Sequence, residues 1–538
     1  MSIPSSVRCG IRTTNTLVRK SYLIIYFSII ILSAQPSILW FWYFWGFFPP
    51  QLNLTFFILF PLVFFIGLIL LIVSSIIVAK IFLIFINLLH KPREGVFNID
   101  KKDKDYCYWS LRSMVKKWPI WLARQFSLPF LETLAFKIFG IRTFYSNALH
   151  EGWVDCEFVE LGKNIRIGQG SIVMSNILVQ NKLIIKKVVL KDNAVIGAHS
   201  IISPGTTFEP NTILDSLSMT TINQHLDGNS IYSGSPAEKK NKNNIINDKK
   251  RLEQDIFEKE FNEKRDEDFL RARVKELSVP FIFYIGTGMI IVGGSYMLPG
   301  FLFILFVYGI LIPNLFSVPF SFLLLVEWKT LTLLFLTPII IINIYLLHLF
   351  FIALFTKWFY KFANKRGASQ GIFDRNLFEH SKALDYYHVR SFLFKYPIYA
   401  FYRSPFPWLL NWELRFIDSN KVGKGTVFEE CYIHSHNNFG KNCYLGTFSH
   451  ITNHLIDGVY GSENLTFFGV EVGDNSIINA LTGGLPGTEI GNNSTMLPMG
   501  TTMKFDKLLG NNIYAGLPAK PLNKEEINLF LGGEYDGT

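Results

Sequence analysis

Four of the eleven histidines in this 538-residue chain lie close together, namely His434, His436, His450 and His454. An imidazole exchanges a proton near pH 7, so such residues can act as general bases toward an amine or a hydroxyl. Three imidazoles can also hold a zinc ion. Many histidines do neither. The choice between catalysis, metal binding and a structural role therefore depends on the elements that position these residues.

A six-residue apolar period runs through residues 190–236 and returns in residues 472–518. Large apolar residues stand at every sixth position from Leu190 to Leu214, and the series returns from Val472 to Thr502, with Gly484 and Thr502 as its two exceptions. This period fits neither an α-helix nor an alternating strand, but it is typical of a parallel β-helix in which each side takes one hexapeptide. Three sides predict a coil of about 18 residues, with Gly, Asn and Asp at the corners.

These hexads resemble the left-handed β-helix of hexapeptide-repeat acyltransferases. The strings GNSIYSGSPA (228–237) and GNNIYAGLPA (510–519) are similar to the segment that closes the coenzyme A site of their acetyltransferases. With an apolar segment before each β-helix, the chain also resembles the membrane-embedded terminal module of poly-lysine-synthetase-like nonribosomal peptide synthetases. The resemblance implies an internally duplicated protein, built of α-helical membrane segments plus two left-handed parallel β-helix (hexapeptide-repeat) domains.

The activity implied by the resemblance is acyl transfer from coenzyme A, above all acetyl-CoA, or from a carrier thioester. The acceptor would be an amine or a hydroxyl close to the membrane, and a link to peptide or secondary-metabolite synthesis would fit the same resemblance. In the family, a catalytic histidine stands just before a protruding loop and one coil length ahead of an IGDN-like hexad. His454 stands one coil length before Val472 of VGDN, and His450 is the second candidate on the same segment.

Six residues of the second half are expected to bind coenzyme A, and no metal is expected. The first half has Ile222 and Glu238 where the second has Lys504 and Lys520, and it has no histidine in SNILVQNK (175–182). The first β-helix is therefore expected to be a degenerate copy. The segment INALTGGLP (478–486) departs from a regular hexad, which leaves the path of the pantetheine arm open. The six expected binding residues are Ala480, Lys504, Gly516, Pro518, Ala519 and Lys520.

Two other functions remain open. The histidines could ligate zinc, as in hexapeptide-fold carbonic anhydrases, although the His-x4-His spacing of those enzymes is absent. A non-catalytic scaffold that holds a synthetase partner at the membrane would also suit an anchored protein with a degenerate half. Metal content would identify the first alternative, and a failure to transfer or hydrolyse acyl-CoA would favour the second.

Composition indicates a membrane protein: 49% of the residues are hydrophobic, and 51 are phenylalanine. The net charge is +10, and the basic residues lie beside apolar runs, which favours contact with a lipid bilayer rather than nucleic acid.

Basic flanks at both ends of each membrane segment predict an even number of crossings and two cytoplasmic β-helices in a multi-pass cell-membrane protein. Of three apolar runs in the second half, 279–296 is expected to be re-entrant or interfacial. The five cysteines form no CxxC motif, which agrees with a reducing compartment.

Aromatic, basic and proline-rich segments join the membrane runs to each β-helix and match each other at a constant offset. They are expected to form structural elbows at the headgroup level that join membrane to β-helix, with a groove for a lipid substrate as the alternative. Because sites in the family lie between neighbouring β-helices, the two could pair within one chain, or the chain could form a homo-oligomer.

The expected domain organisation of the chain is a basic tail (1–20), a transmembrane hairpin (21–90), an elbow (91–154), a degenerate β-helix (155–237), a charged helical linker (238–278), further transmembrane segments (279–360), a second elbow (361–415), the active β-helix (416–521) and a tail (522–538).

Overall fold

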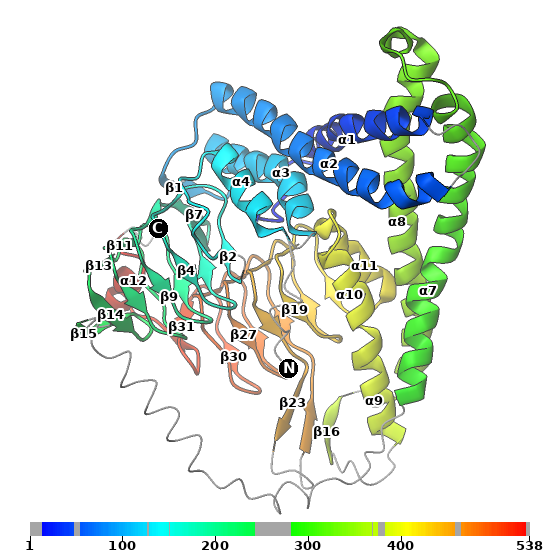
Figure 1. Ribbon diagram of the computed structural model, residues 1–538. Helices are drawn as coiled ribbons and strands as arrows, with labels where there is room; N and C mark the ends of the chain where they lie inside the picture. The colour runs from blue at the N-terminus through cyan, green and yellow to red at the C-terminus, as the bar shows by residue number, and fades with distance from the viewer. Residues whose placement is uncertain are drawn as a thin grey trace, which may run out of the picture.

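The computed structural model describes residues 13–47, 54–125, 128–149, 151–242, 281–367, 370–374, 382–457 and 464–533. Each half contains the same elements in the same order: two long helices, one short strand, elbow helices and a β-helix (Figure 1). The long helices lie together on one side of the molecule, and the two β-helices occupy the other.

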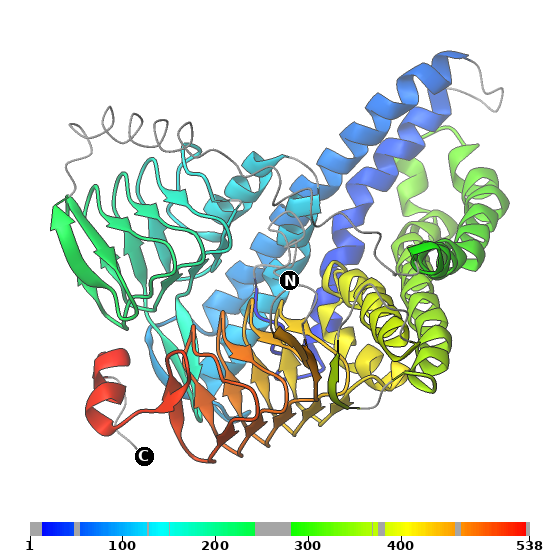
Figure 2. The same cartoon turned by 90° about the horizontal axis from the view of Figure 1, so that it is seen from below.

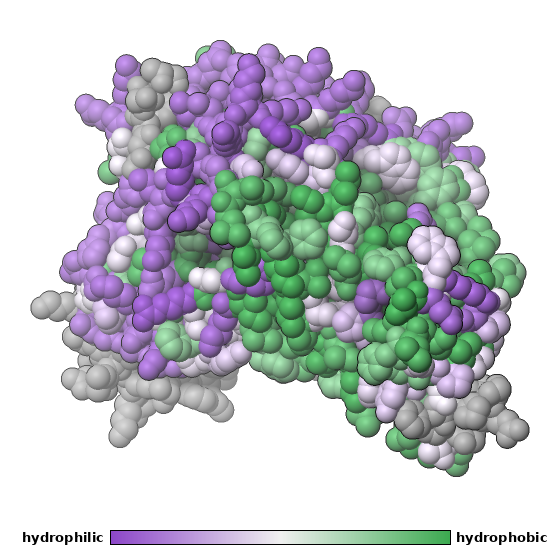
Figure 3. Space-filling model, turned by 90° about the horizontal axis from the view of Figure 1, so that it is seen from above, coloured by the Kyte–Doolittle hydropathy of each residue, from purple (hydrophilic) through white to green (hydrophobic). Residues whose placement is uncertain are grey.

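Four helices of the described residues are long and apolar enough to cross a membrane. Their exposed side chains form one broad apolar area beside a hydrophilic one (Figure 3). The second helix has 36 residues and is about 54 Å long, so it extends beyond a hydrocarbon core of about 30 Å unless it tilts. These helices are α1 (Tyr22–Phe47), α2 (Leu54–Leu89), α7 (Phe281–Phe306) continued by the π-helical η2 (Val307–Phe316), and α8 (Trp328–Asn364).

The run 279–296, expected to be a re-entrant or interfacial segment, is not a separate segment in its described part. Residues Ile282–Phe316 form one candidate span, because the helix continues through Pro299 instead of ending there. A proline inside an apolar helix removes one hydrogen bond, and neighbouring helices or local π-helical turns can compensate for the loss. The first helix likewise continues through Pro36. After Phe316 the chain leaves the span and forms only the short 3₁₀ turn η3 (Phe322–Val326) before α8.

Three basic residues of the elbows are buried inside the protein. Arg112, Lys117 and Arg390 are each 2% exposed or less. Arg112 is paired with Glu157 of the first β-helix, Nε to Oε1, at 2.6 Å. Lys117 donates to the carbonyls of Thr13 and Thr14, so both residues bind acceptors of the chain itself. The elbow elements are β1 (Gly95–Asn98), α3 (Lys104–Gln125) and α4 (Pro129–Phe139), then β16 (Gly371–Asp374), α9 (Lys382–Leu393), α10 (Lys395–Tyr402), η4 (Pro407–Leu409) and α11 (Leu410–Ile417).

Each β-helix has three parallel ladders, one for each side of the coil. Phe208 pairs with Leu190 on one side and with Leu226 on the other, so stacked residues are separated by the predicted coil length. The residue at every sixth position points inward and is buried. In the first half the ladders are β2 (Trp153–Val154), β5 (Ile172–Val173) and β10 (Ile201–Ile202); β3 (Val159–Leu161), β8 (Val188–Leu190), β11 (Thr207–Phe208) and β13 (His225–Leu226); β4 (Arg166–Ile167), β9 (Val195–Ile196), β12 (Ile213–Leu214) and β14 (Ser230–Ser233).

The second half repeats this arrangement. Gly484 takes an inward position without a side chain, and Ile451 of the preceding coil fills the space, since a Cβ at Gly484 would lie 2.8 Å from Ile451 Cδ1. The ladders are β17 (Lys421–Val422), β20 (Asn438–Phe439), β25 (Glu471–Val472), β28 (Glu489–Ile490) and β30 (Lys507–Leu508); β18 (Val427–Phe428), β21 (Tyr444–Leu445), β26 (Ile477–Ile478), β29 (Thr495–Met496) and β31 (Ile513–Ala515); β19 (Tyr432–Ile433), β22 (His450–Ile451) and β27 (Gly483–Gly484).

An antiparallel hairpin leaves each β-helix where the hexad frame is interrupted. The elbow strand adds to it as a third strand, β1 in the first half and β16 in the second. In each half, a short strand follows the closing segment (228–237 or 510–519) and pairs antiparallel with the last strand of one ladder. These strands are β15 (Glu238–Lys242), which pairs with β14, and β32 (Lys520–Pro521), which pairs with β31. Residues 238–242 are thus a strand and not part of a helical linker, whose remainder lies outside the described residues. The hairpins are β6 (Asn176–Val179) with β7 (Lys182–Ile185), and β23 (His454–Asp457) with β24 (Asn464–Phe467).

The two β-helices of the chain pack against each other (Figure 2). The hairpin of the first half contacts the second half, where Asn479 Nδ2 donates to the carbonyl of Leu178 at 3.2 Å. The C-terminal helix α12 (Lys524–Phe530) returns to the first β-helix, and Ile222 N donates to the carbonyl of Phe530. One apolar cluster spans this junction, with Trp153, Ile172, Ile177 and Ile201 from the first half and Ala480, Leu497, Ile513 and Ala515 from the second.

Candidate functional site

His454 is the first residue of β23, at the base of the second hairpin. Its Nδ1 lies 3.1 Å from the side-chain oxygen of Asn453, and Nδ1 of His434 lies 3.2 Å from the same oxygen. Asn453 is buried and its Nδ2 donates to the carbonyl of Ser435 at 2.6 Å, so its side-chain oxygen is the acceptor in both contacts. Both imidazoles are therefore assigned a proton on Nδ1, so Nε2 is the unprotonated nitrogen of each neutral ring.

Aromatic rings and a buried arginine surround this histidine cluster. The ring of Tyr387 lies edge-on to that of His454, with centroids 5.4 Å apart. Burial, together with the neighbouring His454, lowers the pKa of His434 well below its ordinary value. Burial, together with Arg390, lowers the pKa of His436 to about 4. His434 and His436 are therefore neutral at pH 7.

Lys504 lies on the same corner of the β-helix as His454, two coils further along. The strand of His450 and Ile451 pairs with Gly483 and Gly484, and Gly483 pairs in turn with Thr501. The turns that follow these strands therefore stack above one another, and they carry His454 in the first turn and Lys504 in the third. With strand pairs about 4.8 Å apart, two coils separate the backbones of these residues by about 10 Å along the axis.

The remaining expected coenzyme A residues lie on another corner. Ala480 follows β26, and the exposed turn of Gly516 and Pro518 follows β31 two coils later, so these residues share the corner that precedes the His450 ladder. Ala519 is buried, while Lys520 is exposed on the return strand β32. The expected set is thus divided between two corners.

His450 lies on the flat side between these corners. Its imidazole covers Gly483, where an added Cβ would lie only 2.5 Å from Nε2, so this glycine is required for the ring to fit. Burial lowers the pKa of His450. Its strand position directs Ile451 inward and the imidazole outward.

The histidines do not form a metal site within the described ranges. The four histidines lie close together in the sequence, but among the described residues no group of three or more His, Cys, Asp or Glu side chains is arranged to hold one metal ion. The zinc alternative therefore lacks its ligand set in this part of the chain.

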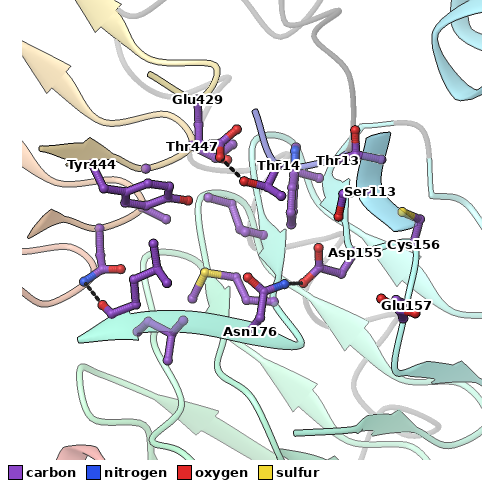
Figure 4. A pocket seen from close by; sticks show the side chains of 18 of the residues that line it. Thr13, Thr14, Ser113, Asp155, Cys156, Glu157, Asn176, Glu429, Tyr444 and Thr447 are labelled. Carbon is purple, nitrogen blue, oxygen red and sulfur yellow. Dashed lines mark hydrogen bonds between the residues drawn. The ribbon is translucent and has the colours of Figure 1, made fainter. Parts of the chain in front are cut away.

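A pocket lies at the junction of the two β-helices (Figure 4). It encloses about 620 Å³, open solvent at its mouth included. The segment that precedes α1 forms one wall: Thr14 Oγ1 and Asn15 N both donate to the carboxylate of Glu429. Polar groups of both halves line the pocket, including Asp155, Asn176, Glu429, Tyr444 and Asn479, together with Ala480, the one expected coenzyme A residue among the lining residues.

Sequence reasoning did not identify this pocket. The signal that could have found it is the alignment of the two halves, in which Asp155 and Glu157 stand where the second half has His434 and His436. Both pairs follow the equivalent strands β2 and β19. No sequence pattern indicates the role of residues 13–16, because these residues interact with groups that are distant in the sequence.

No protein-family model matches the sequence, and no curated protein matches it. Several solved acyltransferase structures resemble a limited part of the chain. One is AntD, an N-acyltransferase from Bacillus cereus with coenzyme A bound, at 27% identity over 19% of this chain and 60% of its own, with a TM-score of 0.15. A hexapeptide-repeat acetyltransferase from Vibrio cholerae with bound acetyl coenzyme A matches at 15% identity over 20% of this chain and 61% of its own, with a TM-score of 0.18.

A maltose O-acetyltransferase from Clostridium difficile is similar at 14% identity over 21% of this chain and 75% of its own, with a TM-score of 0.17. The chain thus spans about three fifths of the length of the first two matched proteins. Likenesses of this extent identify no family for the chain as a whole. The functional proposal must therefore depend on the residues of this chain.

Proposed function

We propose that the protein is a membrane-bound acyltransferase that moves an acyl group from coenzyme A, or a carrier thioester, to an amine or hydroxyl of a membrane-proximal acceptor. The observation that carries the proposal is the contact between His454 and Asn453, which orients the imidazole with Nε2 as its proton acceptor. The proposal includes left-handed coiling of both β-helices and their origin by duplication. A link to peptide or secondary-metabolite synthesis belongs to the same proposal.

The proposed reaction needs a single base. Nε2 of His454 takes the proton of the acceptor N–H or O–H while that nitrogen or oxygen attacks the thioester carbonyl carbon. The carbon–sulfur bond then breaks, and the imidazolium returns the proton to the leaving thiolate. Asn453 orients the imidazole throughout and holds Nδ1–H. Lys504 and Lys520 would supply point charges for the phosphates of coenzyme A.

The proposal is tested by the release of free coenzyme A from acetyl-CoA by the full chain in lipid nanodiscs. Release is expected to increase when a mixture of membrane lipids and small amines is supplied as acceptors. If the protein binds acetyl-CoA but releases no thiol with any acceptor, the non-catalytic scaffold becomes the better account.

The substitution Lys520→Glu is expected to weaken coenzyme A binding about tenfold at low salt and less at high salt. Lys520 is exposed, so its effect on phosphates is electrostatic and screened by ions. Isothermal titration with coenzyme A at two salt concentrations measures the change. Glu238→Lys, at the equivalent return strand of the first half, is the matched control and should leave affinity unchanged. Equal affinity for Lys520→Glu and the wild type at low salt would remove Lys520 from the proposed site.

We also propose that both β-helices lie in the cytoplasm, because basic residues flank both ends of each pair of apolar helices. A cysteine placed at Asn229 or Asn511, two exposed corner residues, should escape an impermeant maleimide in intact cells and react after permeabilisation. The described native cysteines are buried and serve as a low background. Labelling of just one position in intact cells would mean an odd number of crossings in the second half.

A further inference from the structure

The junction pocket contains a buried acid that the proposed acyl transfer does not use. Asp155 is 6% exposed, and its Oδ2 accepts three hydrogen bonds: from Ser175 N at 2.7 Å, from Ser175 Oγ at 2.9 Å and from Asn176 Nδ2 at 2.7 Å. All three donors are neutral. No described residue donates to Oδ1. Figure 4 shows the carboxyl group of Asp155 beside Asn176 in the wall of the pocket.

The basic side chains nearest to Asp155 are engaged elsewhere. Arg112 and Lys116 both pair with Glu157, at 2.6 Å and 3.6 Å. Lys117 donates to the carbonyls of Thr13 and Thr14, at 3.2 Å and 2.9 Å. Within the ranges that the structure describes, no Lys, Arg or His forms an ion pair with Asp155. Among the described residues the acid therefore has no ion-pair partner, and Lys116 acts on it only at longer range.

A second acid lines the same pocket from the other β-helix. The carboxylate of Glu429 accepts from Thr14 Oγ1 and Asn15 N, which are again neutral donors. Burial raises the pKa of Glu429, an effect that Lys117 partly offsets, and burial raises the pKa of Asp155 to about 7, because a charged carboxylate is costly to bury. Other titratable groups that face Asp155 are Cys156, Glu157, Lys116 and Tyr444. As far as the described residues show, the pocket thus contains acceptor atoms that receive no hydrogen bond and a carboxylate, Asp155, that forms no ion pair.

We propose that the junction pocket binds the primary ammonium group of a small organic amine, with the Asp155 carboxylate as its counter-ion. An ammonium group has three N–H donors, and the pocket offers Asp155 Oδ1 and the side-chain oxygen of Asn176, which accepts no hydrogen bond from a described residue. Ile177, Met174 and Trp109 provide apolar surface for the carbon chain of the amine. The inference goes beyond the proposed acyl transfer and does not depend on it.

The second half supplies an internal comparison. His434 stands in place of Asp155 and His454 in place of Asn176, so the corresponding place there has two neutral or basic rings and no carboxylate. Recognition of a cation is therefore confined to the first half. This difference also gives the first β-helix, expected from its sequence to be a degenerate copy, a function of its own.

The test uses the full chain in detergent micelles, with n-butylamine as the probe and n-butanol as its uncharged counterpart, at constant ionic strength. Butylamine should raise the thermal unfolding midpoint in a saturable way, and butanol should not. Asp155→Asn should weaken the apparent affinity by about tenfold or more, whereas Asp215→Asn, the same change at an exposed position of this β-helix, should leave it unchanged. An equal response in Asp155→Asn, or no response in the wild type, would overturn the proposal.

The pH dependence of butylamine binding by the wild type gives a second readout, which does not depend on the stability of the Asp155→Asn variant. Only the ionised carboxylate attracts an ammonium ion, while an alkylamine stays protonated up to about pH 10. Affinity of the wild type for butylamine should therefore rise as the pH increases from about 6 to 8, through the raised pKa of Asp155. A falling or flat profile would contradict the assignment. His454→Ala should bind butylamine normally, so failure of the acyl-transfer proposal would leave this result intact.

Discussion

His454→Ala is expected to lower acyl-transfer turnover by roughly 10²–10⁴-fold while leaving coenzyme A affinity nearly unchanged. The imidazole takes up a proton only as the acceptor attacks, so its loss raises the barrier without removing a contact to the donor. The substitution should not unfold the protein, because His454 is half-buried at the base of a hairpin and does not point into the β-helix core. Thiol release under saturating acetyl-CoA measures turnover, and titration calorimetry measures affinity.

His450→Ala is the matched control for that experiment. His450 lies on the neighbouring ladder with its ring over Gly483, so its removal empties a surface space but leaves the contact between His454 and Asn453 in place. A modest change in turnover is therefore expected. If His450→Ala abolishes turnover and His454→Ala does not, His450 is the base; if both variants remain active, neither histidine catalyses the reaction.

Lys117→Met is expected to destabilise the protein by about 3–5 kcal/mol, the usual cost of removing one member of a buried charged group. Lys117 is fully buried and donates to the Thr13 and Thr14 carbonyls and to Asn15, while Thr14 and Asn15 donate to Glu429 across the junction. The segment thus links a cation of the first elbow to an acid of the second β-helix. Without the lysine, three acceptors lose their donor and Glu429 loses the nearest positive charge.

Thermal unfolding in micelles measures this effect. Lys395→Met is the control, because Lys395 occupies the same position of the second elbow but is exposed, and it should leave the midpoint unchanged. The double variant Lys117→Met, Glu429→Gln should recover part of the lost stability, since it removes both charges together. Equal midpoints for Lys117→Met and Lys395→Met would show that the buried link does not stabilise the junction.

The six-residue period predicted the β-helices well, because each inward position carries its own local signal. Ile196, Ile202 and Leu214 are buried in the register that the period requires, and the hairpin appears where the frame is interrupted. The corners were predictable for the same reason: Asn193 and Asn475 adopt positive φ, which asparagine tolerates better than most residues.

Features that depend on distant partners could not be predicted in this way. The apolar run 279–296 looked separable because Pro299 follows it, yet Pro299 lies inside one continuous helix. The elbow arginines had the composition of a headgroup belt, and only the fold reveals that Glu157 pairs with Arg112. The division of the expected coenzyme A residues between two corners also escaped prediction, since spacing along the chain does not say which corner of a coil a residue occupies.

A structure of the full chain with a non-hydrolysable thioether analogue of acetyl-CoA tests the central claim most directly. The proposal predicts the thioether and the adjacent carbonyl beside Nε2 of His454, with the phosphates near Lys504 or Lys520. An analogue bound in the junction pocket, with its carbonyl beside Asp155 and Asn176 and none beside His454, would contradict it.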